Sequence, residues 1–257
     1  MRFATWNVAS LKARMPRVTA WLADAQPDVL CLQETKCPDD AFPAKRFKRL
    51  GYEHIALNGQ KGYHGVAIVS RVPFDKIDKR GFCGKTDSRH IAVTIGEQAK
   101  HKDPLTIHNF YVPAGGDIPE PDANDKFAHK LHFLQAMEKF FARRKAKRKD
   151  PVILVGDLNV APLENDVWSH KQLLNIVSHT PVETHLLGQA QAAFDWIDSE
   201  MRVMLAMQRP DGHVEDWYGE GNFNRTALLH ALLKSQGVRA APWRPGLQVG
   251  AVREKDN

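Results

Sequence analysis

A chain of 257 residues can bury a sizeable hydrophobic core, and this length is compatible with one large domain or two small ones. Its formal net charge of +6 favours anionic partners, of which nucleic acid is one candidate. The three cysteines have no common zinc-binding spacing and indicate a reducing compartment. No stretch has the apolar length of a signal-peptide core or of a membrane span. We therefore expect a cytoplasmic protein without a membrane partner.

Short apolar runs bounded by turn-forming residues predict six β-strands in the first two thirds of the chain. These runs span residues 3–8, 29–33, 65–70, 90–95, 105–112 and 152–156. Residues 15–25 and 125–147 have helical patterns, and Pro16 is suited to the first turn of the earlier helix. Strands and helices in this order predict helices layered around sheets.

Three of the predicted strands end in polar residues, within the stretches TWNVAS, LQETK and VGDLNV. The polar residues of interest at these ends are Asn7, Glu34, Asp157 and Asn159. Carboxylate and carboxamide oxygens are hard ligands, so neighbouring strand ends would form a site for Mg²⁺ or Mn²⁺. Asp157 and Asn159 are two positions apart and point to the same side if the strand continues through them. An acid beside an amide can take a proton from water and stabilise a phosphodiester under attack.

Each of these residues also has a structural interpretation. Asn7 alone is typical of a turn, Glu34 of an exposed end of an edge strand or the start of a helix, and Asp157 of a capping position. Tyr111 is compatible with an ordinary core position or with a hydroxyl that binds phosphate. The basic stretch ARRKAKRK, residues 142–149, is better explained as a solvated helix end than as a phosphate-binding patch. A functional interpretation therefore depends on the combination of residues.

Five stretches do occur in combination. In chain order, FATWNVASLKAR, PDVLCLQETK, GYHGVAIVSR, NFYVPAGG and VILVGDLNVAP closely resemble the exonuclease III family of abasic-site endonucleases, within the endonuclease/exonuclease/phosphatase superfamily. LQETK and GDLNVAP are specific together, and GYHGVAIVSR and WNVASLKAR favour the DNA-repair branch over phosphoinositide or sphingomyelin hydrolases. The resemblance covers residues 1 to about 198, so we expect a domain at 1–198 followed by an atypical segment at 199–257.

The resemblance implies a four-layered α/β sandwich, in which two mixed sheets face each other and the active site lies at one end between them. It implies that Glu34 is a metal ligand and that Asn7 shares the metal or phosphate shell. Asp157 would activate water or protonate the leaving group. Asn159 would position the phosphate, and Tyr111 would contact it. Asn159 is also a candidate metal ligand, together with Asn7, Glu34 and Asp157.

The reaction implied by the resemblance is Mg²⁺-dependent hydrolysis 5′ to an abasic site, with 3′ to 5′ exonuclease and 3′-phosphodiesterase activity. The partner would be double-stranded DNA with abasic sites or 3′ ends, bound by a monomer. Four basic residues are candidates for contacts to the DNA backbone, namely Lys12, Arg14, Lys85 and Arg89. Two alternatives stay open: a catalytically inactive DNA-binding protein on the same fold, and a phosphodiesterase that acts on RNA or another phosphoester.

The resemblance stops in residues 199–257. The family carries an Arg-x-Asp-type strand and a Ser-Asp-His-x-Pro turn near its C-terminus, and no Asp-His dipeptide occurs anywhere in this chain. We therefore expect reduced activity, and an incomplete second sheet unless the tail replaces the missing strands. Residues 225–236 form a predicted amphipathic helix.

Three explanations for this tail are a divergent enzyme, a fold without full activity, and a sequence from another gene or reading frame. We favour the last because the resemblance ends abruptly. Some tail residues could serve as replacement ligands, but a surface position is the better interpretation for each of them: Asp211, His213, Asp216 and His230.

Overall fold

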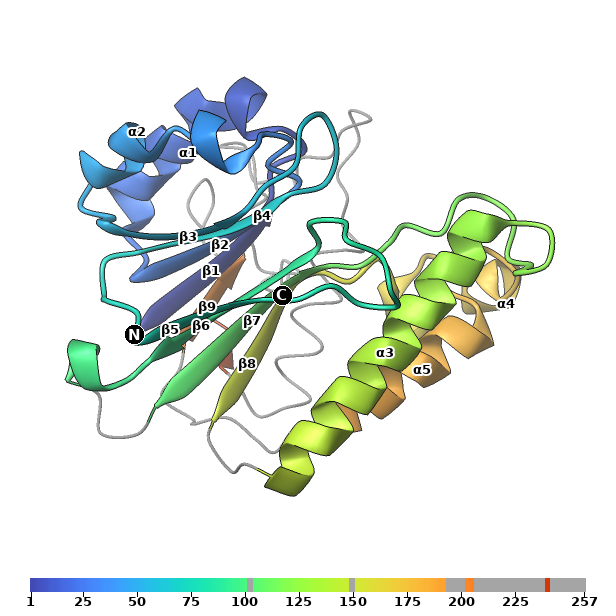
Figure 1. The fold of residues 1–257 in the computed structure, drawn as a ribbon. Coiled ribbons are helices and arrows are strands. Elements are labelled where there is room, and N and C mark those ends of the chain that lie inside the picture. Colours follow the sequence, from blue (N-terminus) through green and yellow to red (C-terminus); the bar gives the residue numbers. More distant parts are fainter. Residues whose placement is uncertain (101–103, 148–150, 193–201, 206–238, 241–257) are drawn as a thin grey trace, which may run out of the picture.

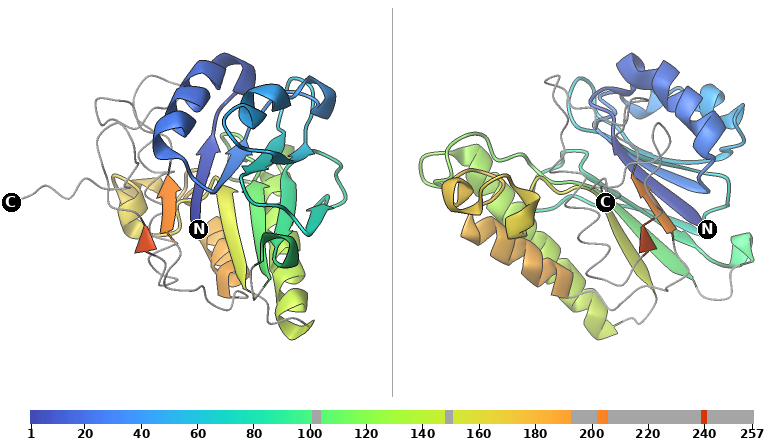
Figure 2. Two further views of the ribbon diagram at one scale, coloured as in Figure 1. Left: turned by 90° about the vertical axis from the view of Figure 1, so that its left-hand side faces the viewer. Right: turned by 180° about the vertical axis from the view of Figure 1, so that it is seen from behind.

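The computed structural model describes residues 1–100, 104–147, 151–192, 202–205 and 239–240. Its strands form two mixed sheets, one of six strands in the order β10-β9-β1-β2-β4-β3 and one of four in the order β5-β6-β7-β8. The sheets face each other, with helices on the outer side of each (Figures 1 and 2). The predicted four-layered α/β sandwich is therefore confirmed.

The six-stranded sheet contains both parallel and antiparallel pairs. Its strands are β1 (Arg2–Asn7), β2 (Val29–Gln33), β3 (His54–Asn58), β4 (Val66–Ser70), β9 (Arg202–Leu205) and β10 (Arg239–Ala240). β1 runs parallel to both β2 and β9, whereas β4 is antiparallel to β2 and β3. Because β1 and β2 are parallel, their carboxyl ends reach the same edge of the sheet, with Asn7 opposite Gln33.

The four-stranded sheet consists of β5 (Lys76–Lys79), β6 (His90–Ile95), β7 (Leu105–Tyr111) and β8 (Val152–Asp157). β7 and β8 are parallel, which requires a crossover connection, and α3 (Asp125–Lys147) provides it. The register pairs Tyr111 with Asp157, the last residues of the two strands. In this sheet too, polar residues arrive together at one edge.

Buried apolar side chains fill the space between the sheets. From the first sheet they include Phe3, Val29, Cys31 and Ile68, and from the second Ile91, Val93, Ile107, Ile153 and Val155. In β7 and β8 these residues alternate along the strand, because successive side chains point to opposite faces. The opposite faces pack against helices, which explains why both sheets are apolar on both sides.

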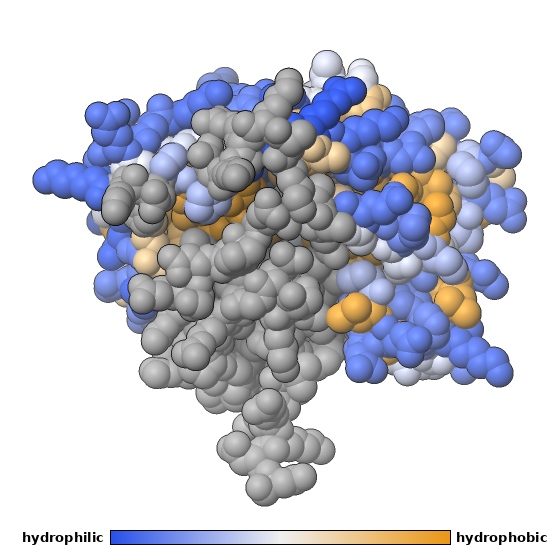
Figure 3. Space-filling model, turned by 90° about the horizontal axis from the view of Figure 1, so that it is seen from below, coloured by the Kyte–Doolittle hydropathy of each residue, from blue (hydrophilic) through white to orange (hydrophobic). Residues whose placement is uncertain are grey.

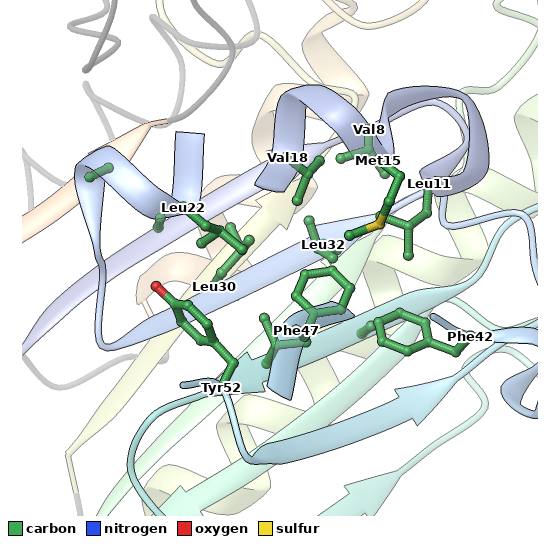
Figure 4. Packing of buried hydrophobic residues seen from close by; sticks show 14 residues of the cluster. Val8, Leu11, Met15, Val18, Leu22, Leu30, Leu32, Phe42, Phe47 and Tyr52 are labelled. Atoms are coloured by element: carbon green, nitrogen blue, oxygen red, sulfur yellow. The ribbon is translucent and has the colours of Figure 1, made fainter. Parts of the chain in front are cut away.

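The outer layers are helical. α1 (Leu11–Ala25) and α2 (Ala44–Lys48) cover the first sheet, while α3 and α5 (Pro181–Ala192) lie side by side over the second, near the short α4 (His170–Leu173) (Figure 1). Leu11, Met15, Val18 and Leu22 of α1 pack with Phe47 and Tyr52 above β2 (Figure 4). Their spacing of three or four residues gives α1 a single apolar face.

The chain-order predictions agree with the structure at the six expected strands, with end shifts of at most one residue. The helix predicted at 15–25 begins four residues earlier, at Leu11, so Pro16 lies inside it and not at its start. Residues 125–147 are helical as predicted. The helix predicted at 225–236 lies outside the described residues.

Some elements were not predicted. β5, with the sequence KIDK, is an edge strand with mostly exposed side chains, so it lacks the apolar run that marks a buried strand. α5 follows Thr180, which caps it: Glu183 N donates to Thr180 Oγ1 at 3.4 Å, and Thr180 N donates to Glu183 Oε2 at 3.2 Å. This Thr-x-x-Glu capping box, with Pro181 at the first helical position, is a helix-start signal in the sequence.

The described part of the surface is mostly hydrophilic on the face seen in Figure 3, with separate hydrophobic patches. Large apolar side chains that are exposed include Tyr63, Ile118, Leu163, Trp168 and Ile176. Among the described helices, none combines the length and apolar character needed to span a bilayer.

Candidate active site

The candidate site lies where the carboxyl ends of β1, β2, β7 and β8 meet. Asn7 ends β1, Glu34 follows β2, Tyr111 ends β7 and Asp157 ends β8. The first two belong to one sheet and the last two to the other. The structure thus brings together four of the predicted side chains from segments that are up to 150 residues apart in the sequence.

The amide of Asn7 joins the two sheets. Its Nδ2 donates to Glu34 Oε1 at 3.0 Å and to Asp157 Oδ2 at 2.7 Å, while its Oδ1 accepts the backbone N–H of Ala9 at 3.0 Å. The bond from Ala9 fixes which side of the amide faces the carboxylates. Asn7 and Asp157 are buried, so both bonds lie in a region where hydrogen bonding is strong and an unpaired group is costly.

A second polar link between the sheets lies next to the first. Gln33 Nε2 donates to Asn109 Oδ1 at 2.6 Å, and Asn109 Nδ2 donates to the carbonyls of Leu32 and Ala67 at 2.9 and 3.0 Å. Both side chains are about 1% exposed or less. Satisfied buried amides of this kind are directional, so they fix how one sheet is placed on the other close to the site.

Glu34 is held as a carboxylate. Burial opposes its ionisation, but hydrogen bonds from Asn7, Lys36 and Tyr111 outweigh that effect, so its pKa lies below the ordinary value. The Lys36 ammonium is 2.9 Å from Oε2. The backbone of Glu34 is left-handed, with φ of 52°, and this turn directs its side chain across the strand end.

Tyr111 is held as a neutral phenol. Burial raises its pKa, and the negative charges of Glu34 and Asp157 raise it further. Its hydroxyl therefore keeps its proton and donates to Glu34. Arg89 lies over the ring, with its guanidinium carbon 4.9 Å from the centroid, and Nη1 donates to the Tyr111 carbonyl at 3.3 Å. An ion pair with Asp87 holds Arg89 in that position.

Gly156 allows β8 to approach β7 closely enough to place Asp157 beside Tyr111. Its φ is +136°, and a Cβ at this position would lie 1.9 Å from the carbonyl oxygen of Phe110. Residues with a side chain rarely adopt this backbone conformation, and real Cβ atoms do not approach a backbone oxygen so closely. Gly156 is therefore part of the geometry of the site.

Asn159 lies beside Asp157 for a reason different from the one expected. The strand ends at Asp157 and does not continue, and Asn159 occupies a left-handed turn with φ of 50°. Its backbone N–H donates to Asp157 Oδ1 at 3.2 Å, and its side-chain Nδ2 donates to the Val112 carbonyl at 2.8 Å. A turn, and not the two-residue period of a strand, brings the acid and the amide together.

A model of the Endonuclease/Exonuclease/phosphatase family matches residues 4–229. This chain belongs to that family. The resemblance found in the sequence motifs is thereby confirmed.

Relatives that carry specific names include the exodeoxyribonuclease III of Haemophilus influenzae, 31% identical over 65% of this chain and 60% of the relative. A DNA-(apurinic or apyrimidinic site) endonuclease of Dictyostelium discoideum is 30% identical over 66% of this chain and 45% of the relative. The chain thus spans less than two thirds of the length of these curated relatives. Both are named as enzymes that cut nucleic acid.

Solved structures of the same family superpose well on this fold. An AP endonuclease from Archaeoglobus fulgidus has a TM-score of 0.63 and 31% identity, covering 74% of this chain and 69% of its own. A 3′ phosphatase from Neisseria, bound to a product DNA hairpin, has a TM-score of 0.64 and 30% identity, with the same coverage. The endonuclease/exonuclease/phosphatase fold therefore applies to most of this chain.

Divalent cations are general cofactors of exonuclease III-like members of this family, and the residues present fit one. Glu34 and Asp157 both lie within hydrogen-bond distance of one nitrogen of Asn7, so two carboxylates converge on a small volume. Mg²⁺ typically takes one or two carboxylates and keeps water on its other positions. The two donors are carboxylates, which suit a hard cation better than they suit zinc, because zinc sites are usually built from Cys and His. Among the described residues, no group of three or more His, Cys, Asp or Glu side chains is placed to hold a metal ion.

The basic residues expected to contact DNA lie at different depths. Lys12 and Lys85 are exposed, Arg14 is half-buried, and Arg89 is only 7% exposed in its place beside Tyr111. Lys12 is in the first turn of α1, whose preceding residue Ser10 donates its N–H to the Glu34 carbonyl at 2.8 Å. The start of α1 is thus attached to the site. The tail residues considered as replacement ligands lie outside the described part of the chain.

Two supporting residues were not assigned a role from the sequence. Lys36 follows Glu34 within LQETK, and its position two residues after the acid was a usable signal. Lys130 is in α3 and is fully buried, as are Phe133 and Met137 of the same helix. A lysine within an apolar face has to find a buried partner, which sequence spacing does not identify.

Proposed function

We propose that this chain is a divalent-metal-dependent nuclease of DNA repair, of the exonuclease III and AP endonuclease type. The observation that carries the proposal is the Asn7 amide, which joins the carboxylates of Glu34 and Asp157 across the two sheets. The names of its relatives support DNA as the substrate, and the matched motifs support abasic sites and 3′ ends as the positions attacked.

The chemistry follows from the character of each side chain. Asp157 can accept a proton from water or return one to the leaving oxygen. Tyr111 would supply a neutral O–H donor for a phosphate oxygen, which requires its hydroxyl to exchange its present acceptor, Glu34, for that oxygen. Asn159 would position the phosphate, which requires its amide to exchange its present acceptor, the Val112 carbonyl, for a phosphate oxygen.

Glu34, oriented by the hydrogen bond from Asn7 Nδ2, would hold the cation, and Mg²⁺ is the ion we propose. Bound there, the cation would neutralise charge on the phosphodiester. Lys36 keeps Glu34 ionised and so keeps it available as a ligand. We further propose that the enzyme works as a monomer in the cytoplasm, with Lys12 and Lys85 contacting the DNA backbone.

A labelled duplex that contains one abasic site tests the proposal. Wild-type protein should cut 5′ to the abasic site with Mg²⁺ and should stop when EDTA is added. Asp157→Asn should lower the rate by about two orders of magnitude or more, because it removes the proton-handling group. Cleavage that persists in EDTA, or that is equal in the variant, would refute the assignment.

One observation favours a second candidate, a DNA-binding protein with little turnover on the same fold. The chain contains no Asp-His dipeptide, so the turn that completes the family's metal and phosphate contacts has no counterpart in the sequence. On this candidate, abasic duplex would bind with strong salt dependence and would remain uncut by a well-folded sample. A third class, with RNA or another phosphoester as substrate, would be recognised by profiling those substrates in the same assay.

A further inference from the structure

Lys130 of α3 forms a buried ion pair with Glu183 of α5, and both side chains are 0% exposed. Removing two charges from water is costly, and such a pair is often no better for stability than apolar residues of the same volume. Fold stability alone therefore does not explain the pair. The contacts of Lys130 and Glu183 indicate a role in the candidate active site.

The Lys130 ammonium contacts three separate loops. Nζ donates to the Asn159 carbonyl at 2.6 Å, to the Ala114 carbonyl at 3.2 Å, and to Ser178 Oγ at 3.4 Å. Asn159 follows β8, Ala114 follows β7, and Ser178 precedes α5. A single cation thus ties together the segments that leave the two strands of the second sheet at the edge where the site lies.

Two of these segments carry the candidate catalytic residues directly. Val112 lies two residues before Ala114; its N–H donates to the Asp157 carbonyl at 2.9 Å, and its carbonyl accepts the Asn159 side-chain amide at 2.8 Å. The Asn159 carbonyl that Lys130 binds belongs to the left-handed turn that aims the Asn159 N–H at Asp157. Moving that carbonyl would rotate the peptide planes on which both contacts depend.

The loop after β7 is shaped to admit the lysine. Gly115 has φ of +94°, and a Cβ there would lie 2.8 Å from Lys130 Cδ and 2.9 Å from Val177 Cγ1. Any side chain at this position would press on the Lys130 stem. The PAGG stretch, which the proposed chemistry does not use, therefore has a role in this packing.

Glu183 extends the same network to the loop that precedes α5. Its two carboxylate oxygens accept the Ser178 N–H at 3.0 Å each, and Oε2 also accepts Thr180 Oγ1 at 2.6 Å. The Ser178 carbonyl in turn accepts the N–H of Ala161, two residues beyond Asn159, at 2.7 Å. The pair consequently holds the chain after Asn159 at two points, directly at the Asn159 carbonyl and through Ser178 at Ala161.

We propose that Lys130, together with Glu183, is a positioning residue for Asp157 and Asn159. It neither touches the proposed substrate nor moves a proton; it fixes the backbone that aims the acid and the amide at the phosphodiester. This proposal rests on the proposed nuclease function, and it predicts that loss of the pair lowers the turnover number far more than it changes substrate affinity.

The test compares Lys130→Met with the double variant Lys130→Met/Glu183→Gln. The single variant leaves a buried carboxylate unpaired and should lower Tm, whereas the double variant removes both charges and should recover much of that loss. Lys139→Met serves as the control, because it is the same substitution at an exposed position of the same helix.

On abasic duplex with Mg²⁺, both Lys130 variants should lose kcat by about 10- to 100-fold with KM within about twofold of wild type, and the control should match wild type. A double variant that recovers both Tm and kcat would overturn the positioning role and leave a purely structural one. Wild-type kcat in a folded Lys130→Met sample would overturn it as well.

A readout independent of turnover separates this proposal from the proposed function. In protein labelled with ¹⁵N-asparagine, the backbone and side-chain amide signals of Asn159 should shift in both Lys130 variants and stay in place in Lys139→Met. Unchanged Asn159 signals in the folded double variant would refute the inference. If wild-type protein cuts no DNA, only the proposed function is refuted. The Asn159 amide signals then still test whether Lys130 positions Asn159.

Discussion

Replacement of Gly156 by alanine tests how the site is assembled, because this residue sets the distance between β7 and β8. The new Cβ would lie 1.9 Å from the Phe110 carbonyl oxygen and 2.8 Å from the Phe110 carbonyl carbon. Ordinary contacts begin near 3.4 Å, so backbone atoms have to separate by more than an ångström. The neighbour is a strand and not a flexible side chain, so no rotamer change can absorb the shift.

Two costs add at this position. Holding a residue with a side chain at positive φ costs about 1–2 kcal/mol, and overpacking a well-packed interior costs about 1–3 kcal/mol. We expect Gly156→Ala to lower the free energy of unfolding by about 3 kcal/mol, measured as the midpoint of urea unfolding. The abasic-site cleavage rate of the remaining folded protein should fall by about tenfold or more, since Asp157 moves relative to Tyr111.

Gly188→Ala is the matched control. Gly188 lies within α5, and a Cβ there would meet no heavy atom within 4 Å. Alanine is favoured over glycine in a helix interior by about 1 kcal/mol, so this change should stabilise the protein slightly or leave it unchanged. If Gly156→Ala unfolds at the wild-type urea midpoint and retains full activity, the account of how β8 is placed is wrong.

Three further predictions follow from the same geometry. Asn7→Ala removes the amide that joins Glu34 to Asp157, and we expect about a 100-fold lower kcat in the cleavage assay with a fall in Tm of a few degrees. Tyr111→Phe removes the O–H donor but keeps the ring under Arg89, so kcat/KM should fall by about tenfold while the melting temperature stays within a few degrees. Stability should fall on acidification: burial lowers the pKa of His90 to about 3 and also lowers the pKa of its neighbour His108, so the unfolded chain binds the extra protons first. Of the loss in stability between pH 7 and pH 5, His90 should contribute about 2 kcal/mol, so urea midpoints should show a loss smaller by about that amount in His90→Phe.

Much of the fold could be predicted because it is encoded locally. Buried strands such as β2 and β8 are continuous apolar runs, and α3 has a long helical pattern, so both show in any short window of sequence. β5 and α5 were missed because neither has a strong apolar pattern. β5 is a polar edge strand, and α5 is marked by its capping residues more than by its apolar residues.

The candidate site was predictable in its members but not in its geometry. Polar residues at strand ends pointed to Asn7, Glu34 and Asp157, because parallel strands bring their carboxyl ends to one edge. The contacts across the two sheets depend on how one sheet is placed on the other, which only the packed structure determines. The same holds for Lys130, whose partner lies 53 positions away on a helix that was not predicted.

These contacts bear on what the unusual tail means for activity. The described residues up to 192 already assemble both carboxylates, the Asn7 bridge and the supports provided by Gly156 and the Lys130–Glu183 pair. On the proposed function, this preassembled carboxylate site would bind a cation and a phosphodiester without the Asp-His turn, so the absence of that turn should lower turnover more than binding. Asp157→Asn should therefore still reduce whatever cleavage the wild-type chain performs, because proton handling would then depend on this one acid.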